Sequence, residues 1–488
     1  MAGTGGALGD LAVETILGGS RDRPLPEALK RASELVEHGQ LEEAKQLCLD
    51  AVRQYGEQPL LLRLLGIAAH RSGDIEAAIG WLENAVRREG VPPDCRTQLA
   101  QLYRLTGRLD EAMAAGRVAF AAMPRSSAPS FALGQICIDR GAFDDAAEWL
   151  LRAITIDPEF AAAHLELGQL LLLRGEFRAG WAESEWRYRM PQTRDALPKF
   201  PAPRWNGMRM PRGRILLIGD QGYGDTIQFA RFIPLVAERC REVIVGCSAE
   251  VEALIATVPG AARRVTRWEN VPRFEAESPL SSLPGIFGVE LATIPAPVPY
   301  LSIAAASSQR WAERLAAALA PGALRVGLVW AGRPTHQNDR RRSMRWQDAA
   351  PLAAIPGTAL ASLQKEVPVG DRAEFAAAPG VTDLSPYLTD FVETAGAVES
   401  LDLVVTVDTS VAHLAGALGK PVWVLLPSVP DWRWLLDRED SPWYPTMRLF
   451  RQIGNEGWGG VVSRVAAELR AVSGGSRDRL LPSGGGVR

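Results

Sequence analysis

The chain has 488 residues, more than one ordinary hydrophobic core holds, so two or three domains are expected. Its apolar (47%) and charged (23%) fractions are those of globular proteins. A net charge of −3 does not suggest the basic surface that binds nucleic acid or anionic membranes.

Targeting and redox features favour the cytoplasm. Residues 1–25 are predicted to be a disordered N-terminus, and they lack the basic region of a secretion signal. No apolar run reaches the roughly 20 residues that cross a bilayer, so no transmembrane segment is expected. The five cysteines are scattered and form no CxxC pair, which argues against a disulfide framework or a zinc site.

Residues 26–190 form a repeat array with a period of 34 residues. Glycines recur at this spacing at Gly39, Gly73, Gly107, Gly141 and Gly175. Alanines keep the same register at Ala44, Ala78, Ala112 and Ala146. Glycine permits the left-handed end of one helix, and acidic residues after it favour the first turn of the next. The pattern resembles the tetratricopeptide repeat and predicts an all-α solenoid whose helical hairpins share one core.

The fifth repeat departs from this pattern. Gly180 stands where an alanine is expected, and the aromatic residues after it include Trp181 and Trp186. They predict a capping helix that docks the array on the next domain; a plain terminal cap is a compatible alternative. Residues 191–212 contain five prolines and predict a short, fairly rigid linker.

A βαβ unit is predicted next, with a strand at 214–218, a helix at 226–239 and a strand at 242–246. Its glycine-rich turn contains Gly222 and Gly224. The spacing is not the dinucleotide fingerprint, and the Lys-Ser/Thr pair of a Walker loop is missing. The glycines are therefore predicted to let a substrate approach the backbone. From 259 to 300 the chain is proline-rich, and no regular element is predicted.

A second α/β half contains the most informative stretch. The apolar run 403–407 ends in Asp408, Thr409 and Ser410, and a small-residue helix, a turn and another apolar run come after them. The turn places hydroxyl groups, a carboxylate and helix N–H groups at the carboxyl end of a strand, where ligands and anions bind. The anion expected here is the diphosphate of an activated sugar.

Three further groups of residues in this half are candidates for donor binding. His413 lies in the helix after Ser410, and its neutral imidazole could donate to phosphate, although a packed helical histidine is the alternative. The loop after the strand predicted from residue 324 holds His336, Asp339 and Arg342; an arginine fork matches phosphate oxygens, whereas a solvated basic loop is the alternative. Gln364 and Lys365 come after the next apolar stretch, and Lys365 could reach phosphate as a point charge.

The ordered motifs carry a resemblance to a known family. The segments GDQGYGDTIQFARFIPL and VDTSVAHLAGALGKPVW resemble the two-Rossmann glycosyltransferases of the heptosyltransferase type, glycosyltransferase family 9. VGLVWAGRPTHQNDRRRS and SPWYPTMRLFRQ resemble the variety fused behind tetratricopeptide repeats in bacteria. The resemblance covers most of residues 26–470. It implies a GT-B fold with an acceptor-side lobe at 213–305 and a donor-binding lobe at 306–472. The overall plan is also similar to that of O-GlcNAc transferases, in architecture only.

The resemblance implies an inverting transfer of a hexose or heptose from a nucleotide sugar, with no metal ion or other cofactor. Asp225 matches the family's catalytic base, although an aspartate there is also a good helix cap. Asp408, Thr409 and His413 match residues that contact sugar and phosphate. Ser410 departs from the family's glycine, so the sugar need not be a heptose.

The acceptor is expected to be a protein captured by the repeat groove, with flagellin as one candidate, and a lipid or polysaccharide acceptor is the alternative. The alternative is an inactive scaffold or a nucleotide-sugar-binding adaptor. Residues 473–488 are predicted to be a disordered tail.

Overall fold

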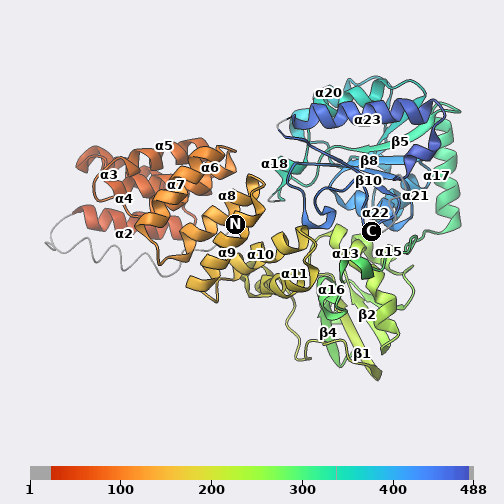
Figure 1. Cartoon of the computed structure of the whole chain (residues 1–488), viewed down its shortest axis with the longest axis horizontal. Helices are drawn as coiled ribbons and strands as arrows, with labels where there is room; N and C mark the ends of the chain where they lie inside the picture. The colour runs from red at the N-terminus through yellow and green to blue at the C-terminus, as the bar shows by residue number, and fades with distance from the viewer. Residues whose placement is uncertain (1–23, 337, 455, 483–488) are drawn as a thin grey trace. The chain divides into compact units, whose positions relative to one another are not determined.

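The computed structural model describes residues 24–336, 338–454 and 456–482 (Figure 1). Nearly all of the predicted disordered N-terminus lies outside these residues, and a helix already begins at Pro24. The described chain forms two compact units. The first ends at Leu170 and also includes Trp186–Ala196, and the second contains Leu171–Glu185 and everything from Leu197.

The first unit is a helical repeat array (Figure 1). Its helices are α2 (Pro24–Glu37), α3 (Leu41–Tyr55), α4 (Pro59–Arg71), α5 (Ile75–Val86), α6 (Asp94–Leu105), α7 (Leu109–Ala122), α8 (Ser127–Asp139), α9 (Phe143–Ile156) and α10 (Ala161–Leu173), which crosses into the second unit. The five periodic glycines have φ between 72° and 89°, a left-handed conformation that ends each first helix. The four periodic alanines are fully buried, so the predicted solenoid is confirmed.

The capping helix α11 (Phe177–Ser184) belongs to the second unit. A Cβ atom on Gly180 would lie 2.7 Å from the Leu172 side chain and 2.9 Å from its backbone nitrogen, which explains why glycine replaces alanine there. Trp181 is buried, and its indole N–H donates to the Val289 carbonyl at 2.9 Å.

The predicted linker at 191–212 is shorter than expected. Its first part is the helix α12 (Pro191–Ala196), and strand β1 already begins at Met210. Between them, the Trp205 N–H donates to the Glu277 carbonyl at 2.7 Å, so the segment runs beside the first sheet.

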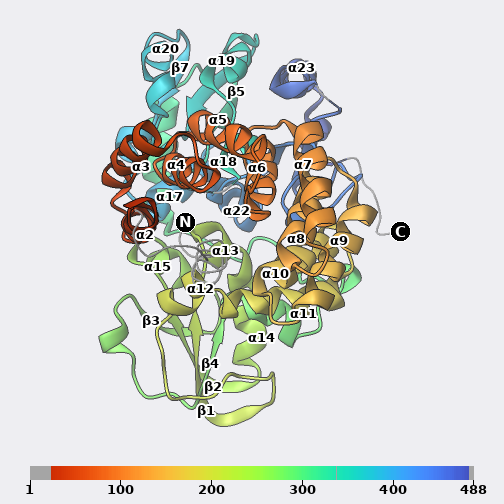
Figure 2. The same ribbon diagram turned by 90° about the vertical axis from the view of Figure 1, so that its left-hand side faces the viewer.

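The N-terminal lobe has a parallel four-stranded sheet in the order β3-β2-β1-β4. Figure 2 labels its four strands. The strands are β1 (Met210–Ile218), β2 (Cys240–Gly246), β3 (Ala261–Val265) and β4 (Ala276–Pro279). The expectation of an irregular 259–300 was therefore wrong: β3 and β4 are too short to show a period among the prolines. The single helix predicted at 226–239 is divided into α13 (Tyr223–Phe229), the 3-10 helix Ala230–Phe232 and α14 (Ile233–Ala237). The other helices are α15 (Ala249–Ile255) and α16 (Leu283–Ile286).

The C-terminal lobe has a parallel six-stranded sheet in the order β10-β9-β8-β5-β6-β7. The strands are β5 (Leu324–Val329), β6 (Thr358–Ser362), β7 (Val381–Asp383), β8 (Leu403–Val407), β9 (Val422–Leu426) and β10 (Met447–Arg451). The helices are α17 (Ala305–Ala318), α18 (Asp339–Arg342), α19 (Trp346–Ala349), α20 (Arg372–Ala376), α21 (Phe391–Glu399), α22 (Ser410–Ala417) and α23 (Gly457–Ser473). The predicted fold class, a repeat solenoid and then two Rossmann-like lobes, is confirmed.

The described part of the predicted disordered tail is ordered against this lobe. After α23 the chain forms the 3-10 helix Arg477–Leu480. The Trp423 indole N–H donates to the Leu480 carbonyl at 3.1 Å, and Leu480 packs against the core. These contacts explain why the glycine-rich composition misled the prediction for 473–482. Residues 483–488 lie outside the described residues.

Within the described ranges, none of the helices is both long enough and apolar enough to cross a membrane. All five cysteines are free and buried.

Candidate active site at the lobe junction

Asp225 stands in the first turn of α13, after the glycine-rich turn that follows β1. One carboxylate oxygen accepts the Gly222 backbone N–H at 2.9 Å, as a helix-capping aspartate does. The other oxygen forms an ion pair with Arg433 of the C-terminal lobe. Burial raises the pKa of Asp225, while the guanidinium of Arg433 opposes this rise. The carboxylate therefore caps its own helix and also reaches the other lobe.

Gly224 brings α13 against α22. A Cβ atom at this position would lie 2.9 Å from Cδ2 of His413 and 3.5 Å from Cα of Ser410. The glycine-rich turn of the first lobe and the Asp408–Ser410 turn of the second lobe face each other, as predicted. At Gly224 the two segments are in contact. The space beside Gly224 is filled by His413, so the glycine here serves the approach of two helices rather than of a substrate.

His413 is buried and well packed. Its Nδ1 lies 3.0 Å from the Tyr444 hydroxyl, and its ring stacks on Trp434 with centroids 5.6 Å apart. Burial, with the nearby guanidinium groups of Arg433 and Arg231, keeps its pKa well below the ordinary value of 6.5. The imidazole is therefore neutral. Its Nε2 side faces Gly224 at the junction.

Arg433 is the principal residue that sequence reasoning missed. It lies in the 3-10 helix Trp432–Trp434, between β9 and β10, and only 8% of it is exposed. Besides Asp225, its guanidinium donates to Gln228 Oε1 at 2.5 Å and to Asp431 Oδ1 at 2.8 Å. A usable signal existed, because Asp431-Trp432-Arg433-Trp434 places charges between aromatics shortly after the carboxyl end of a predicted strand.

Asp408 lies next to this cluster at the end of β8. Burial and the Asp431 carboxylate raise its pKa from 3.8 to about 6. Its backbone carbonyl accepts from Arg342 Nη1 at 3.0 Å. Thr409, not Asp408, holds the N-cap position of α22, and it makes no side-chain capping bond. The alternative of Asp408 as the helix cap is therefore not observed.

The basic loop is ordered around Arg342. Gly332 leaves room for this side chain, because a Cβ atom there would lie 2.5 Å from Arg342 Nη2. Asp339 accepts from Arg342 Nε at 3.4 Å and from the Ser343 hydroxyl at 2.8 Å. His336 is exposed, and its Nδ1 accepts the Asn338 N–H at 3.2 Å. Arg342 is thus brought to the Asp408 carbonyl, whereas His336 lies in the exposed part of the loop.

The remaining predicted residues differ in what their side chains do. Gln364 is buried. Its side-chain amide donates to the carbonyls of Ala331 and Glu366, each at 3.0 Å. Its side-chain oxygen accepts the backbone N–H groups of Trp330 and Ala331. It ties the ends of β5 and β6 together. Lys365 is exposed and donates to the Ser385 carbonyl at 3.3 Å. The Thr409 hydroxyl lies 3.1 Å from that of Thr406.

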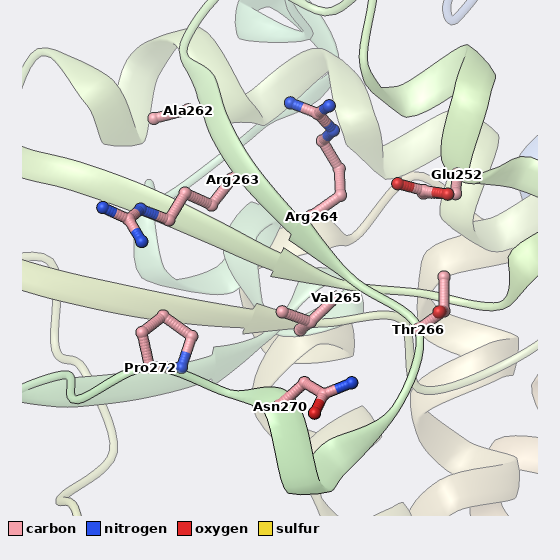
Figure 3. A pocket seen from close by; sticks show the side chains of 8 residues that line it. All are labelled: Glu252, Ala262, Arg263, Arg264, Val265, Thr266, Asn270 and Pro272. Carbon is pink, nitrogen blue, oxygen red and sulfur yellow. The ribbon is translucent and has the colours of Figure 1, made fainter.

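Two cavities in the described structure lie away from the predicted site residues. One of about 450 Å³ lies beside β3 in the N-terminal lobe, where Arg263, Arg264 and Asn270 contribute to its lining (Figure 3). Figure 3 shows the two guanidinium groups pointing in different directions, and Arg263 is paired with Glu242. The other cavity, of about 430 Å³, is lined by residues including Pro356 and Arg470. Neither is lined by a predicted site residue.

The described residues include no cluster of three or more His, Cys, Asp or Glu that could hold a metal ion. The expectation of a metal-free reaction stays a prediction.

Comparisons with known proteins identify the repeats. A model described as "Tetratricopeptide repeat" matches residues 29–94, and one described as "TPR repeat" matches residues 134–175. The array is therefore made of tetratricopeptide repeats.

Among curated proteins, the chain is similar to Protein FlbA of Caulobacter vibrioides, with 27% identity over 332 residues. The match covers 62% of this chain and 54% of that protein, so the chain spans about half the length of this relative.

Similar solved structures cover different parts of the chain. A MamA fragment from Desulfovibrio magneticus RS-1 is 16% identical, covers 36% of this chain and 100% of its own, and has a TM-score of 0.32. E. coli ADP-heptose lps heptosyltransferase II is 15% identical, covers 53% of this chain and 98% of its own, and has a TM-score of 0.39. Both scores are below 0.5, so the fold assignment rests on the topology described above.

Proposed function

We propose that the chain is a glycosyltransferase that moves a sugar from a nucleotide-sugar donor to an acceptor. The observation that carries the proposal is the meeting of charged groups from both lobes at one junction. Asp225 comes after β1 of the first lobe, Asp408 comes after β8 of the second, and Arg342 and Arg433 lie with them. The carboxyl ends of parallel strands are where α/β proteins hold their ligands.

Each part of the reaction has a candidate residue. Asp225 takes the proton from the acceptor group as it attacks the anomeric carbon, and the sugar–diphosphate bond breaks with its electron pair leaving on the diphosphate. Arg342 stabilises the leaving charge from the donor side. Attack opposite the leaving group gives inversion, and arginine takes the place of a metal ion in the proposal. His336, Asp339, Lys365, Thr409, Ser410 and His413 remain candidates for donor contact.

The acceptor in this proposal is a protein held by the repeats. Stacked helical repeats present extended surfaces for binding other proteins. Transfer to a cytoplasmic protein fits the free, buried cysteines, and flagellin is one candidate acceptor.

Donor binding is the first test. Thermal shifts are measured with ADP-, UDP- and GDP-sugars, because a ligand at about 100 times its Kd stabilises a protein by about 2.7 kcal/mol. Arg342→Ala should reduce the shift, and Arg314→Ala, a change at an arginine that stacks on Tyr387, is the control. No shift with any nucleotide or nucleotide sugar would favour the inactive scaffold.

Transfer is the second test. Intact-mass spectrometry of candidate acceptor proteins, incubated with the chain and the donor that binds, should show the added sugar. Binding without transfer to any acceptor or water would favour the adaptor alternative.

A further inference from the structure

Arg433 links the two lobes through one face of α13. Its Nη2 pairs with Asp225, and its Nε donates to Gln228 Oε1 at 2.5 Å. Asp225 and Gln228 are three residues apart, so they lie on the same face of the helix. A planar guanidinium contacts both at once, which a lysine ammonium does not reproduce.

The guanidinium is itself held in place from the C-terminal lobe. Asp431 Oδ1 accepts from both Nη1 at 2.8 Å and the backbone N–H of Arg433 at 3.0 Å. The Trp432 ring covers the guanidinium, with Cζ 4.3 Å from the ring centroid. Because Arg433 is bound on three sides and buried, the oxygen it contacts on Asp225 has little freedom to turn.

Asp225 is surrounded by groups of both signs. Asp220, from the turn before α13, and Asp431, from the facing loop, favour its protonated form, as does burial. Arg433 and the Gly222 N–H favour its ionised form. The facing α22 contributes the neutral His413 beside Gly224, and Asp408 interacts electrostatically with Arg433. Among the described side chains around Asp225, Arg433 is therefore the one whose charge favours the ionised form of Asp225.

We propose that Arg433 is the positioning residue for the base of the proposed reaction: its guanidinium pairs with the Asp225 carboxylate and directs it into the lobe junction. The inference rests on the proposed function. In the step it supports, the acceptor O–H bond breaks and its proton moves to the Asp225 carboxylate. The acceptor oxygen bonds to the anomeric carbon, and the diphosphate leaves with the electron pair of the broken C–O bond. In this step Arg433 acts only through its contact with the Asp225 carboxylate.

The test is the pH profile of nucleoside diphosphate release, with the nucleotide sugar that gives the largest thermal shift. Arg433→Met removes the charge that favours the carboxylate, so the acidic limb should move to higher pH by about one unit or more. Asp431→Asn keeps an oxygen acceptor for Arg433 but removes a charge that favours protonation, so the limb should move to lower pH. Arg433→Lys should leave the limb near that of the wild type while lowering turnover.

Controls separate this role from other roles. Arg239→Met, which removes an arginine bonded to the Gly207 carbonyl, should leave the profile unchanged. The Kd of the free nucleoside diphosphate should be the same in Arg433→Met and wild type.

An unmoved acidic limb, or loss of nucleotide binding in Arg433→Met, overturns the inference while the proposed function stands. If Arg433→Met fails to fold, equal pH profiles for Asp431→Asn and wild type overturn it. A wild-type chain that consumes no donor overturns the proposed function itself.

Discussion

Asp408 shows how burial and a like charge act on one residue. Its carboxyl lies beside Asp431, and its pKa rises from 3.8 to about 6. A raised carboxyl pKa means that the folded state holds a proton that the unfolded chain has released. Between about pH 4 and 6, this residue therefore makes the folded protein less stable as the pH rises, and above that window the full penalty is present.

Asp408→Asn removes this penalty. The stability advantage of the variant over wild type should grow between pH 4 and 6 to about 3 kcal/mol, and it should be constant above about pH 7. Urea unfolding at pH 4, 5, 6, 7 and 8 measures it. Wild-type and variant stabilities that run parallel across this range would contradict the prediction.

Asp225→Asn should abolish transfer, because an amide does not take a proton from the acceptor. Asparagine can still accept the Gly222 N–H, as the carboxylate does. Release of the nucleoside diphosphate measures the loss, and Asp440→Asn, which alters an ion pair with Arg438, should leave transfer intact. Full turnover by Asp225→Asn would remove this residue from the mechanism.

Helix α11 acts as an element that supports the loop carrying Arg433. Trp181 packs edge-on against Trp432, with ring centroids 5.2 Å apart, and Trp432 covers the guanidinium of Arg433. Trp181→Ala should destabilise the second unit by about 3–5 kcal/mol and lower turnover. Trp268→Ala, at a site that is 39% exposed, is the matched control and should cost much less. Equal losses in the two variants, measured by urea unfolding, would argue against a supporting role.

The elements differ in how far the sequence predicts them. The repeat helices and strands β1, β8 and β9 can be predicted from period and apolar runs, because these signals are local. Strands β3 and β4 are too short to be recognised in this way. Local patterns also limit what can be predicted of the site. Asp225, Asp408 and Arg342 are recognised from motifs, whereas the pairing of Arg433 with Asp225 joins residues 208 positions apart. The contact of Gly224 with His413 depends on lobe packing, which no local pattern records.

At the scale of the molecule, Arg231 joins the two lobes into one structure. It is buried in the first lobe and donates to the Trp443 carbonyl at 2.6 Å and to the Tyr300 hydroxyl at 3.1 Å. The Tyr300 hydroxyl donates to the Ile227 carbonyl at 3.0 Å. Because the bond to Trp443 crosses the junction in a buried environment, the lobes should unfold together.

Calorimetry of Arg231→Ala checks this coupling. The variant leaves buried acceptors unpaired, so the lobe transition should shift to lower temperature or divide into two. Arg464→Ala, which removes a surface pair with Glu456, should leave one transition near the wild-type temperature. An unchanged transition in Arg231→Ala would show that the lobes are joined by other contacts.

The close contact at Gly224 offers a practical tool. A single methyl group there would act as a spacer between α13 and α22, because His413 already occupies that volume. Gly224→Ala changes no charge, so it should trap a more open arrangement of the lobes with an otherwise intact set of side chains. Such a form would be suited to crystal soaking with nucleotide sugars, since the ligand would no longer have to separate the lobes in order to enter.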